Sequence, residues 1–247
     1  LGDSITEGLC DPAPDGALRG WAARLALLLA ARSGLDYANL AVRSRRVADV
    51  GGAQLDRARA LRPDLVSILI GANDLVKPRV DIAALAATVE RSVEMLRTDG
   101  AQVVLVTPFL PRLRASALLA RRFSEYASAL AAVAERTGAI FVDTDLHPEL
   151  GERPHWGDDL VHLSSTGHRL LAYRVGEVLG VRDADTLSVL DADLHDAGSG
   201  STGAWWRRHA LPWMWRRIRG RVAGDGRSAK HDDYIRLGRD RVAAPVR

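Results

Sequence analysis

The chain has 247 residues, of which 47% are hydrophobic and 26% charged, and its formal net charge at pH 7 is +3. This length allows one large or two small globular domains, and the ordinary composition excludes a fibrous or low-complexity chain. The single cysteine, Cys10, excludes an intrachain disulfide and leaves no metal site built on cysteines, and no stretch has the roughly 18–20 uninterrupted apolar residues that span a membrane.

The chain opens on a short polar turn that carries a serine, in the sequence Leu1-Gly2-Asp3-Ser4. Gly2 permits close approach of the backbone, and Asp3 and Ser4 favour the start of a helix. A serine at a helix N-terminus lies beside free backbone N–H groups, where negative charge is stabilised. Such a position suits a nucleophile whose reaction creates an oxyanion, although a capping serine in a surface loop is the commoner role of a turn like this one.

Amphipathic helices and short apolar strands alternate through the next part of the chain. Hydrophobic spacing predicts helices over residues 21–34, 47–61, 82–99, 118–138 and 164–179, and strands over residues 37–42, 65–70, 103–106 and 140–142. Strand 65–70 is apolar nearly throughout, as is typical of a parallel strand covered on both faces. The alternation predicts a doubly wound α/β sheet, whose ligand site lies beyond the carboxyl ends of the strands.

The alternation stops after about Val181. We predict a globular domain over residues 1–180, a Gly/Ser-rich linker over 181–203 and a basic, Trp-rich extension over 204–247, in which residues 205–247 carry twelve Arg or Lys against four Asp. The extension can wrap the domain or meet a partner protein, lie on an anionic membrane, or bind nucleic acid. We favour the first interpretation over membrane association, and nucleic-acid binding is the least favoured because no recognisable module supports it.

Two later motifs supply the partners that a nucleophilic serine needs. Asp159 precedes His162 by three residues in a polar loop, and Asn73 follows Gly71 at the end of an apolar strand. A histidine within about 2.6–3.2 Å of Ser4 can take its proton, an aspartate can fix the imidazole tautomer, and an amide can donate to an oxyanion. His168 is a rival base, but it is expected on the first turn of a helix as a buried or surface histidine.

These residues resemble the ordered blocks of the SGNH (GDSL-type) hydrolase family. Gly2-Asp3-Ser4, then 71–74 (Gly-Ala-Asn-Asp), then 159–162 (Asp-Leu-Val-His) match three blocks in the family's order. The resemblance implies a three-layer α/β/α flavodoxin-like sandwich around a five-stranded parallel sheet of order 2-1-3-4-5. It also implies a Ser4, His162 and Asp159 triad, and no cofactor or metal.

The oxyanion hole implied by the resemblance comprises the Ser4 N–H, a backbone N–H at a glycine after the second strand, and the Asn73 side chain. This chain departs from the family at that glycine, because Ser44 stands where the family pattern leads us to expect it. Serine keeps the N–H donor but loses the freedom of glycine at positive φ. We therefore expect a working but narrower hole.

The sequence thus predicts a serine esterase that hydrolyses a small-molecule or glycan ester through an acyl-enzyme, without a nucleic-acid partner. Sugar O-deacetylation, thioester cleavage and acyl transfer remain alternatives at the same site, and a non-catalytic binding protein on a hydrolase fold is the alternative of another class. The extension can make peripheral membrane or protein contacts. A cytoplasmic location is expected. An apolar strand normally precedes a nucleophile of this kind, so we expect further residues before Leu1, and these could include a signal peptide.

Overall fold

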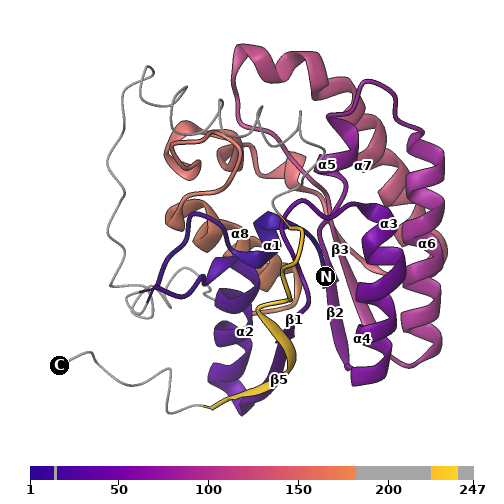
Figure 1. Cartoon of the computed structure of the whole chain (residues 1–247), viewed down its shortest axis with the longest axis vertical. Helices are drawn as coiled ribbons and strands as arrows, with labels where there is room; N and C mark the ends of the chain where they lie inside the picture. Colours follow the sequence, from indigo (N-terminus) through magenta and orange to yellow (C-terminus); the bar gives the residue numbers. More distant parts are fainter. Residues whose placement is uncertain (14–15, 182–223, 239–247) are drawn as a thin grey trace.

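The computed structural model (Figure 1) describes residues 1–13, 16–181 and 224–238. The predicted linker and the Trp-rich stretch 205–217 lie outside the described residues. No helix in the described part of the chain is long and apolar enough to cross a membrane.

Eight α-helical segments and five strands are defined among the described residues. The helices are α1 (Ser4–Glu7), α2 (Gly20–Ser33), α3 (Val47–Asp49), α4 (Leu55–Leu61), α5 (Ala72–Leu75), α6 (Ile82–Thr98), α7 (Ala117–Thr137) and α8 (Ser165–Val178). The strands are β1 (Leu35–Asn39), β2 (Leu65–Ile68), β3 (Gln102–Val106), β4 (Ile140–Val142) and β5 (His231–Leu237). The helix predicted over 47–61 is interrupted by a π-helical segment, Val50–Gln54, in which Gly52 leaves helical geometry.

The long helices form where the predicted apolar spacing places one face against the sheet. In α6 the buried positions Val89, Val93 and Leu96 recur every three or four residues. The helix begins where the Asp81 side chain accepts a hydrogen bond from the Ala84 N–H, at 2.9 Å. The α7 helix ends at Gly138 in the left-handed conformation.

Strands β2, β3 and β4 form a parallel sheet with the order β2-β3-β4. Two hydrophobic clusters cover it: one includes residues of α6 and α7, and the other residues of α2 and α8. Figure 1 shows the resulting three layers, with α6 and α7 on one side of the strands and α2 and α8 on the other. The prediction of a layered α/β fold is confirmed.

The prediction of one five-stranded parallel sheet is not. Strand β1 instead pairs antiparallel with β5, which lies within the predicted extension, and forms a separate two-stranded sheet. Beside β2, the first residues contribute only an isolated parallel bridge between Gly2 and Leu69. The strand that would join β1 to β2 is therefore not formed by the described residues.

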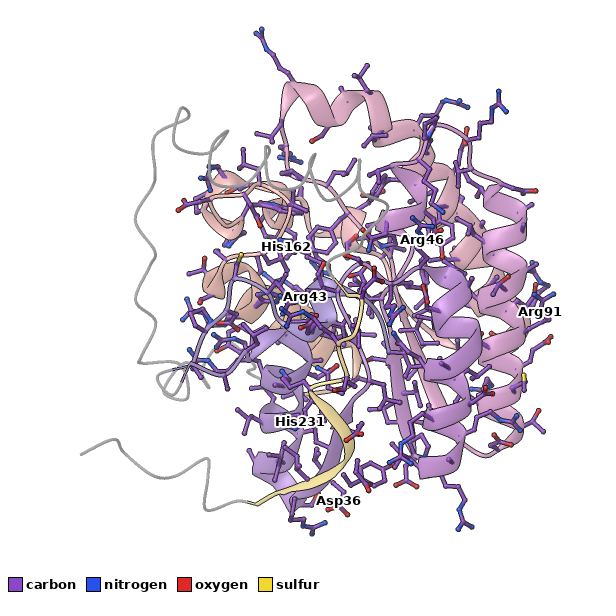
Figure 2. All side chains as sticks on the ribbon, in the orientation of Figure 1. Asp36, Arg43, Arg46, Arg91, His162 and His231 are labelled. Atoms are coloured by element: carbon purple, nitrogen blue, oxygen red, sulfur yellow. The ribbon has the colours of Figure 1, made fainter. Side chains whose placement is uncertain are left out.

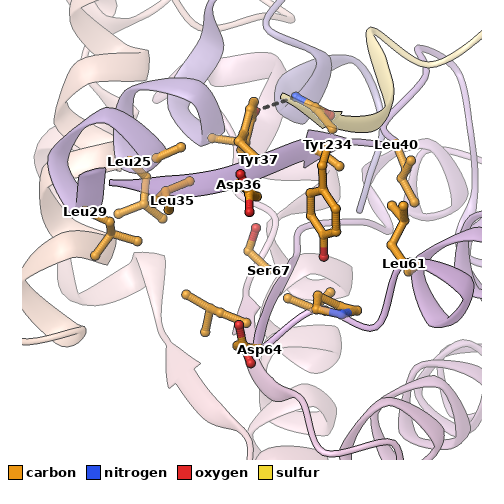
Figure 3. Close-up of a pocket in the computed structure, with 18 of the residues that line it drawn as sticks. Leu25, Leu29, Leu35, Asp36, Tyr37, Leu40, Leu61, Asp64, Ser67 and Tyr234 are labelled. Carbon is orange, nitrogen blue, oxygen red and sulfur yellow. Dashed lines mark hydrogen bonds between the residues drawn. The ribbon is translucent and has the colours of Figure 1, made fainter. Parts of the chain in front are cut away.

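A cavity of about 600 Å³ separates β1 from β2 (Figure 3). Leu25 and Leu29 of α2 line one side, Leu61 of α4 lines another, and Tyr37 and Ser67 come from the two strands. The two sheets are thus separated by a space whose lining is mixed, since Asp36, Asp64 and Arg62 line it beside the leucines. Leu1 and Thr6 are among its lining residues, whereas Ser4, His162 and Asp159 are not.

Candidate active site

Ser4 is the first residue of α1, and its position is fixed by the residues around it. Asp3 caps the helix, because its Oδ1 accepts a hydrogen bond from the Ile5 N–H at 3.1 Å. Gly2 is held on both sides by Gln54, whose Oε1 accepts from the Gly2 N–H and whose Nε2 donates to the Gly2 carbonyl, each at 2.9 Å. A Cβ at Gly2 would lie 2.5 Å from the Leu69 carbonyl oxygen, so this close approach requires glycine.

His162 and Asp159 reach Ser4 from a loop at the other end of the folded chain. The His162 Nε2 lies 2.9 Å from Ser4 Oγ, and its Nδ1 lies 2.5 Å from Asp159 Oδ2. The second carboxylate oxygen of Asp159 accepts from the backbone N–H groups of Val161 and His162, at 3.0 and 2.9 Å. The loop therefore fixes the carboxylate and the imidazole in one unit that faces the serine.

The pKa values of the two carboxylates in the site, Asp3 and Asp159, are shifted in opposite directions. Burial alone would raise the pKa of Asp159, but the His162 hydrogen bond and charge and the two backbone N–H donors outweigh it and lower the pKa to about 2. At Asp3 burial dominates and raises the pKa to about 6, against the opposing effects of the Ile5 N–H and His162. Asp159 is thus an ionised partner for the imidazole across the neutral range.

Asn73 and Ser44, the two residues expected to complete the oxyanion hole, are placed by their own contacts and backbone geometry. The Asn73 Nδ2 donates to Asp3 Oδ2 at 3.2 Å and to the Arg45 carbonyl at 2.9 Å, which links it to the residue that caps α1. Ser44 has a φ of +65°, in the region that favours glycine. Its neighbour Arg43 is held to α1 by hydrogen bonds from its backbone N–H and guanidinium to the Glu7 carboxylate.

Figure 2 shows His162 and Arg43 on neighbouring segments at the same end of the strands. The structure thus brings Ser4, His162 and Asp159 into one hydrogen-bonded series. Asn73 does not contact this series directly: it binds Asp3, the residue that precedes Ser4. Ser44 lies in the loop that follows β1.

Comparison with known proteins gives the family. The model of the GDSL-like lipase/acylhydrolase family matches residues 1–170. The chain belongs to this family.

Two relatives give the scale of the similarity. The acetylxylan esterase of Geobacillus stearothermophilus is 28% identical over 198 residues, which cover 70% of this chain and 88% of that protein. The crystal structure of Axe2, an acetylxylan esterase from the same organism, has a TM-score of 0.61 at 26% identity and covers 72% of this chain and 91% of that one. Together, the family and these relatives make this chain an ester-bond hydrolase.

The fold extends to a more distant structure. LAE5, an alpha/beta hydrolase enzyme from the metagenome of Lake Arreo in Spain, has a TM-score of 0.57 at 22% identity and covers 73% of this chain and 93% of that one. At this identity the likeness concerns the fold alone.

Cys10 is close to Ser4 in the sequence, but its contact with Asp159 is a feature of the site that the sequence did not predict. Its Sγ lies 3.8 Å from Asp159 Oδ2, and burial together with the nearby Asp159 raises the pKa of the thiol to about 12. In the described part of the chain, Cys10, Asp159 and His162 are the group whose donor atoms lie close enough, within 4.8 Å of one another, to hold a metal ion. No local signal could reveal this group, because 149 positions separate Cys10 from Asp159.

Two residues considered with the motifs have structural contacts. Asp74 accepts a hydrogen bond from the Val47 N–H at 3.0 Å and so connects α5 to the start of α3. His168 is fully buried: its Nδ1 accepts from the Trp21 N–H at 3.2 Å, and its Nε2 donates to the Leu9 carbonyl at 2.9 Å. Both of its ring nitrogens are therefore engaged away from Ser4.

Proposed function

We propose that this hydrolase removes acetyl groups from a glycan through an acyl-enzyme formed on Ser4. The observation that carries the proposal is the continuous series from Ser4 Oγ to His162 and from His162 to Asp159. The relatives support the substrate class, because those of highest similarity described above are esterases of acetylxylan. Catalytic mutants of Axe2 replace a serine, a histidine and an aspartate, and there too the aspartate precedes the histidine by three positions.

The reaction begins when Ser4 Oγ attacks the carbonyl carbon of the ester and its proton passes to His162 Nε2. Asp159 stabilises the imidazolium through Nδ1. Collapse of the tetrahedral intermediate breaks the bond between the carbonyl carbon and the sugar oxygen, which leaves with the proton from Nε2. A water molecule then gives a proton to His162 and attacks the acyl-serine, which releases acetate and returns the proton to Ser4.

The oxyanion would be held by the backbone N–H groups of Ser4 and Ser44 and by Asn73 Nδ2. Both N–H groups of Asn73 are already engaged, one with the Arg45 carbonyl at 2.9 Å and one with Asp3 at 3.2 Å. The substrate oxygen would replace the longer of these contacts. Asp3 then keeps the Ile5 N–H as its partner, so α1 stays capped during the exchange.

The test uses acetylated xylooligosaccharides together with p-nitrophenyl esters from acetate to long acyl chains. We expect turnover of the acetyl substrates, complete loss in Ser4→Ala and His162→Ala, and wild-type turnover in Ser33→Ala, which alters an exposed serine of α2. A fluorophosphonate should label the wild type but not Ser4→Ala. Ser4-independent turnover would contradict the mechanism, and a preference for long acyl chains would contradict the proposed substrate.

A further inference from the structure

Lys230 contacts the nucleophile helix from a part of the chain that the family model does not cover. It directly precedes β5, far beyond residue 170. Its Nζ donates to three backbone carbonyls: those of Leu18 and Arg19, each at 2.7 Å, and that of Glu7 at 3.3 Å. A lysine ammonium has three donors and no acceptor, so this set of carbonyls uses all of them.

The three carbonyls belong to two segments that meet beside Ser4. Glu7 is the last residue of α1, whereas Leu18 and Arg19 lead into α2. The backbones touch at Gly8 and Gly20, where a Cβ on either residue would lie within 3 Å of the other. One partly buried ammonium therefore joins the end of the nucleophile helix to the segment that leads into α2.

Glu7 also links Lys230 to the loop that carries Ser44. The Glu7 carboxylate accepts the Arg43 N–H at 2.6 Å and the Arg43 guanidinium, and Ser44 follows Arg43 directly. Gly224, also outside the family match, packs so closely on the Arg43 carbonyl that a Cβ there would lie 2.1 Å from it. Residues 224–230 thus support both the Ser4 helix and the Ser44 loop.

Pairing of β5 with β1 holds Lys230 in place. The two strands pair from Leu35 with Leu237 to Asn39 with His231. Asn39 also donates from Nδ2 to the Thr6 carbonyl of α1 at 2.9 Å, which gives β1 its own contact with the nucleophile helix. Figure 2 shows His231 at the start of β5, on the side of the molecule that carries Arg43.

We propose that Lys230 is a positioning residue that holds the Ser4 helix in its reactive orientation, so that residues 224–238 form part of the functional unit. The proposal rests on the proposed function, because it assigns Lys230 a role through Ser4. The mechanism is mechanical and electrostatic: without the ammonium, three partly buried carbonyls lose this donor, and α1 keeps only its remaining links to α2, such as the Trp21–Thr6 hydrogen bond and the Gly8–Gly20 contact.

The positioning role of Lys230 should depend on pH, because only the protonated side chain can make all three contacts. Burial lowers the pKa of the ammonium to about 8, against the carboxylates of Asp11 and Glu7, which favour the charged form. The imidazole of His231 also faces it. Because the protonated form makes the three contacts, positioning is complete below this pKa and is lost as the pH rises through it.

The experiment compares the full chain with Lys230→Met, Lys230→Arg and Arg236→Gln. Arg236 lies on β5, the strand that follows Lys230, and pairs with Asp36 at the surface, so its variant weakens β5 without touching α1. We expect kcat to fall about tenfold or more in Lys230→Met with little change in KM, since a small misplacement of a reacting group has a large effect on rate. Lys230→Arg should recover part of kcat, and Arg236→Gln should match the wild type.

The pH profile separates positioning from simple loss of stability. The wild type should lose kcat above about pH 8, and this alkaline decline should be absent from the low, flat profile of Lys230→Met. Circular dichroism shows whether Lys230→Met folds. If it does not, the inference is tested by the alkaline decline of kcat in the wild type and in Arg236→Gln. Ser4-dependent turnover with an unchanged kcat in Lys230→Met, or no decline, overturns this inference, whereas turnover that survives in Ser4→Ala overturns the proposed function itself.

Discussion

His162 Nε2 lies 2.9 Å from Ser4 Oγ, although 158 positions separate the two residues in the chain. The contact is made by two short segments, each with a local carboxylate that binds its own backbone N–H groups: Asp3 caps α1, and Asp159 accepts two N–H bonds in its loop. A substitution in one segment can therefore be expected to leave the backbone of the other in place.

Replacing Asp159 with Asn should lower kcat by about 10³–10⁴, because an amide no longer stabilises the imidazolium and permits the wrong tautomer. KM should change little. Asp158→Asn is the matched control, since Asp158 is the neighbouring carboxylate and pairs at the surface with Arg153. Steady-state kinetics on p-nitrophenyl acetate measure both variants, and an equal loss in the two would show that only the overall charge of the loop matters.

Replacing Ser44 with Gly should raise activity. A non-glycine residue at φ +65° carries a strain of about 1 kcal/mol, and we expect the serine side chain to narrow the proposed oxyanion hole. Arg62→Gly is the control, because Arg62 has a φ of +50° at the end of α4 and takes no part in the proposed site. Both variants should change stability by a similar small amount, whereas only Ser44→Gly should increase kcat/KM. Equal activity of Ser44→Gly and the wild type would refute the narrower hole.

Stability should fall between neutral pH and pH 4 because of His168. Burial lowers the pKa of this histidine to about 4 from an ordinary value of 6.5, so the folded state holds it neutral while the unfolded chain binds a proton. The contribution of neutral His168 to the free energy of unfolding is complete above pH 6.5 and is lost as the pH falls to about 4. The loss amounts to about 3 kcal/mol.

Urea unfolding at pH 7 and pH 4.5 measures this effect. The variant His168→Gln can still accept from Trp21 and donate to Leu9, and it should show a smaller difference between the two pH values. The same pH dependence in the variant as in the wild type would assign the effect to other groups.

The Cys10 thiol should react slowly with iodoacetamide at pH 7.5. Part of the residue is accessible to solvent, but the desolvation of its thiol beside Asp159 raises the pKa to about 12, which leaves almost no thiolate at that pH. Because Cys10 lies 3.8 Å from Asp159, modification forced at high pH should reduce esterase activity. Mass spectrometry gives the rate of modification, and Cys10→Ser is the control that should keep its activity. Alkylation at the rate of a free cysteine would contradict the raised pKa.

The sequence predicted what short segments determine by themselves. The spacing of Val89, Val93 and Leu96 indicated the buried face of α6, and polar residues after strand ends indicated where Ser4 and His162 would meet. These features follow from local periodicity and from the geometry of parallel sheets, so one sequence suffices to predict them.

The features that it missed depend on contacts between distant parts of the chain. Strand β5 contains Asp232, Asp233 and Arg236, and it lacks the apolar run that marked the central strands. Its pairing with β1, and hence the place of Lys230, depends on backbone hydrogen bonds between segments about 200 residues apart. The same holds for Cys10, whose neighbour Asp159 is brought to it only by the complete fold.

The close contact of Gly8 with Gly20 has a consequence for engineering. Their φ values are +99° and +76°, and a Cβ on Gly20 would lie 2.5 Å from the Cα of Gly8. Any side chain at either position would separate the nucleophile loop from α2. A saturation library aimed at altering substrate range should therefore keep both codons fixed and place its diversity at exposed positions near the site such as Val161, whose side chain faces solvent.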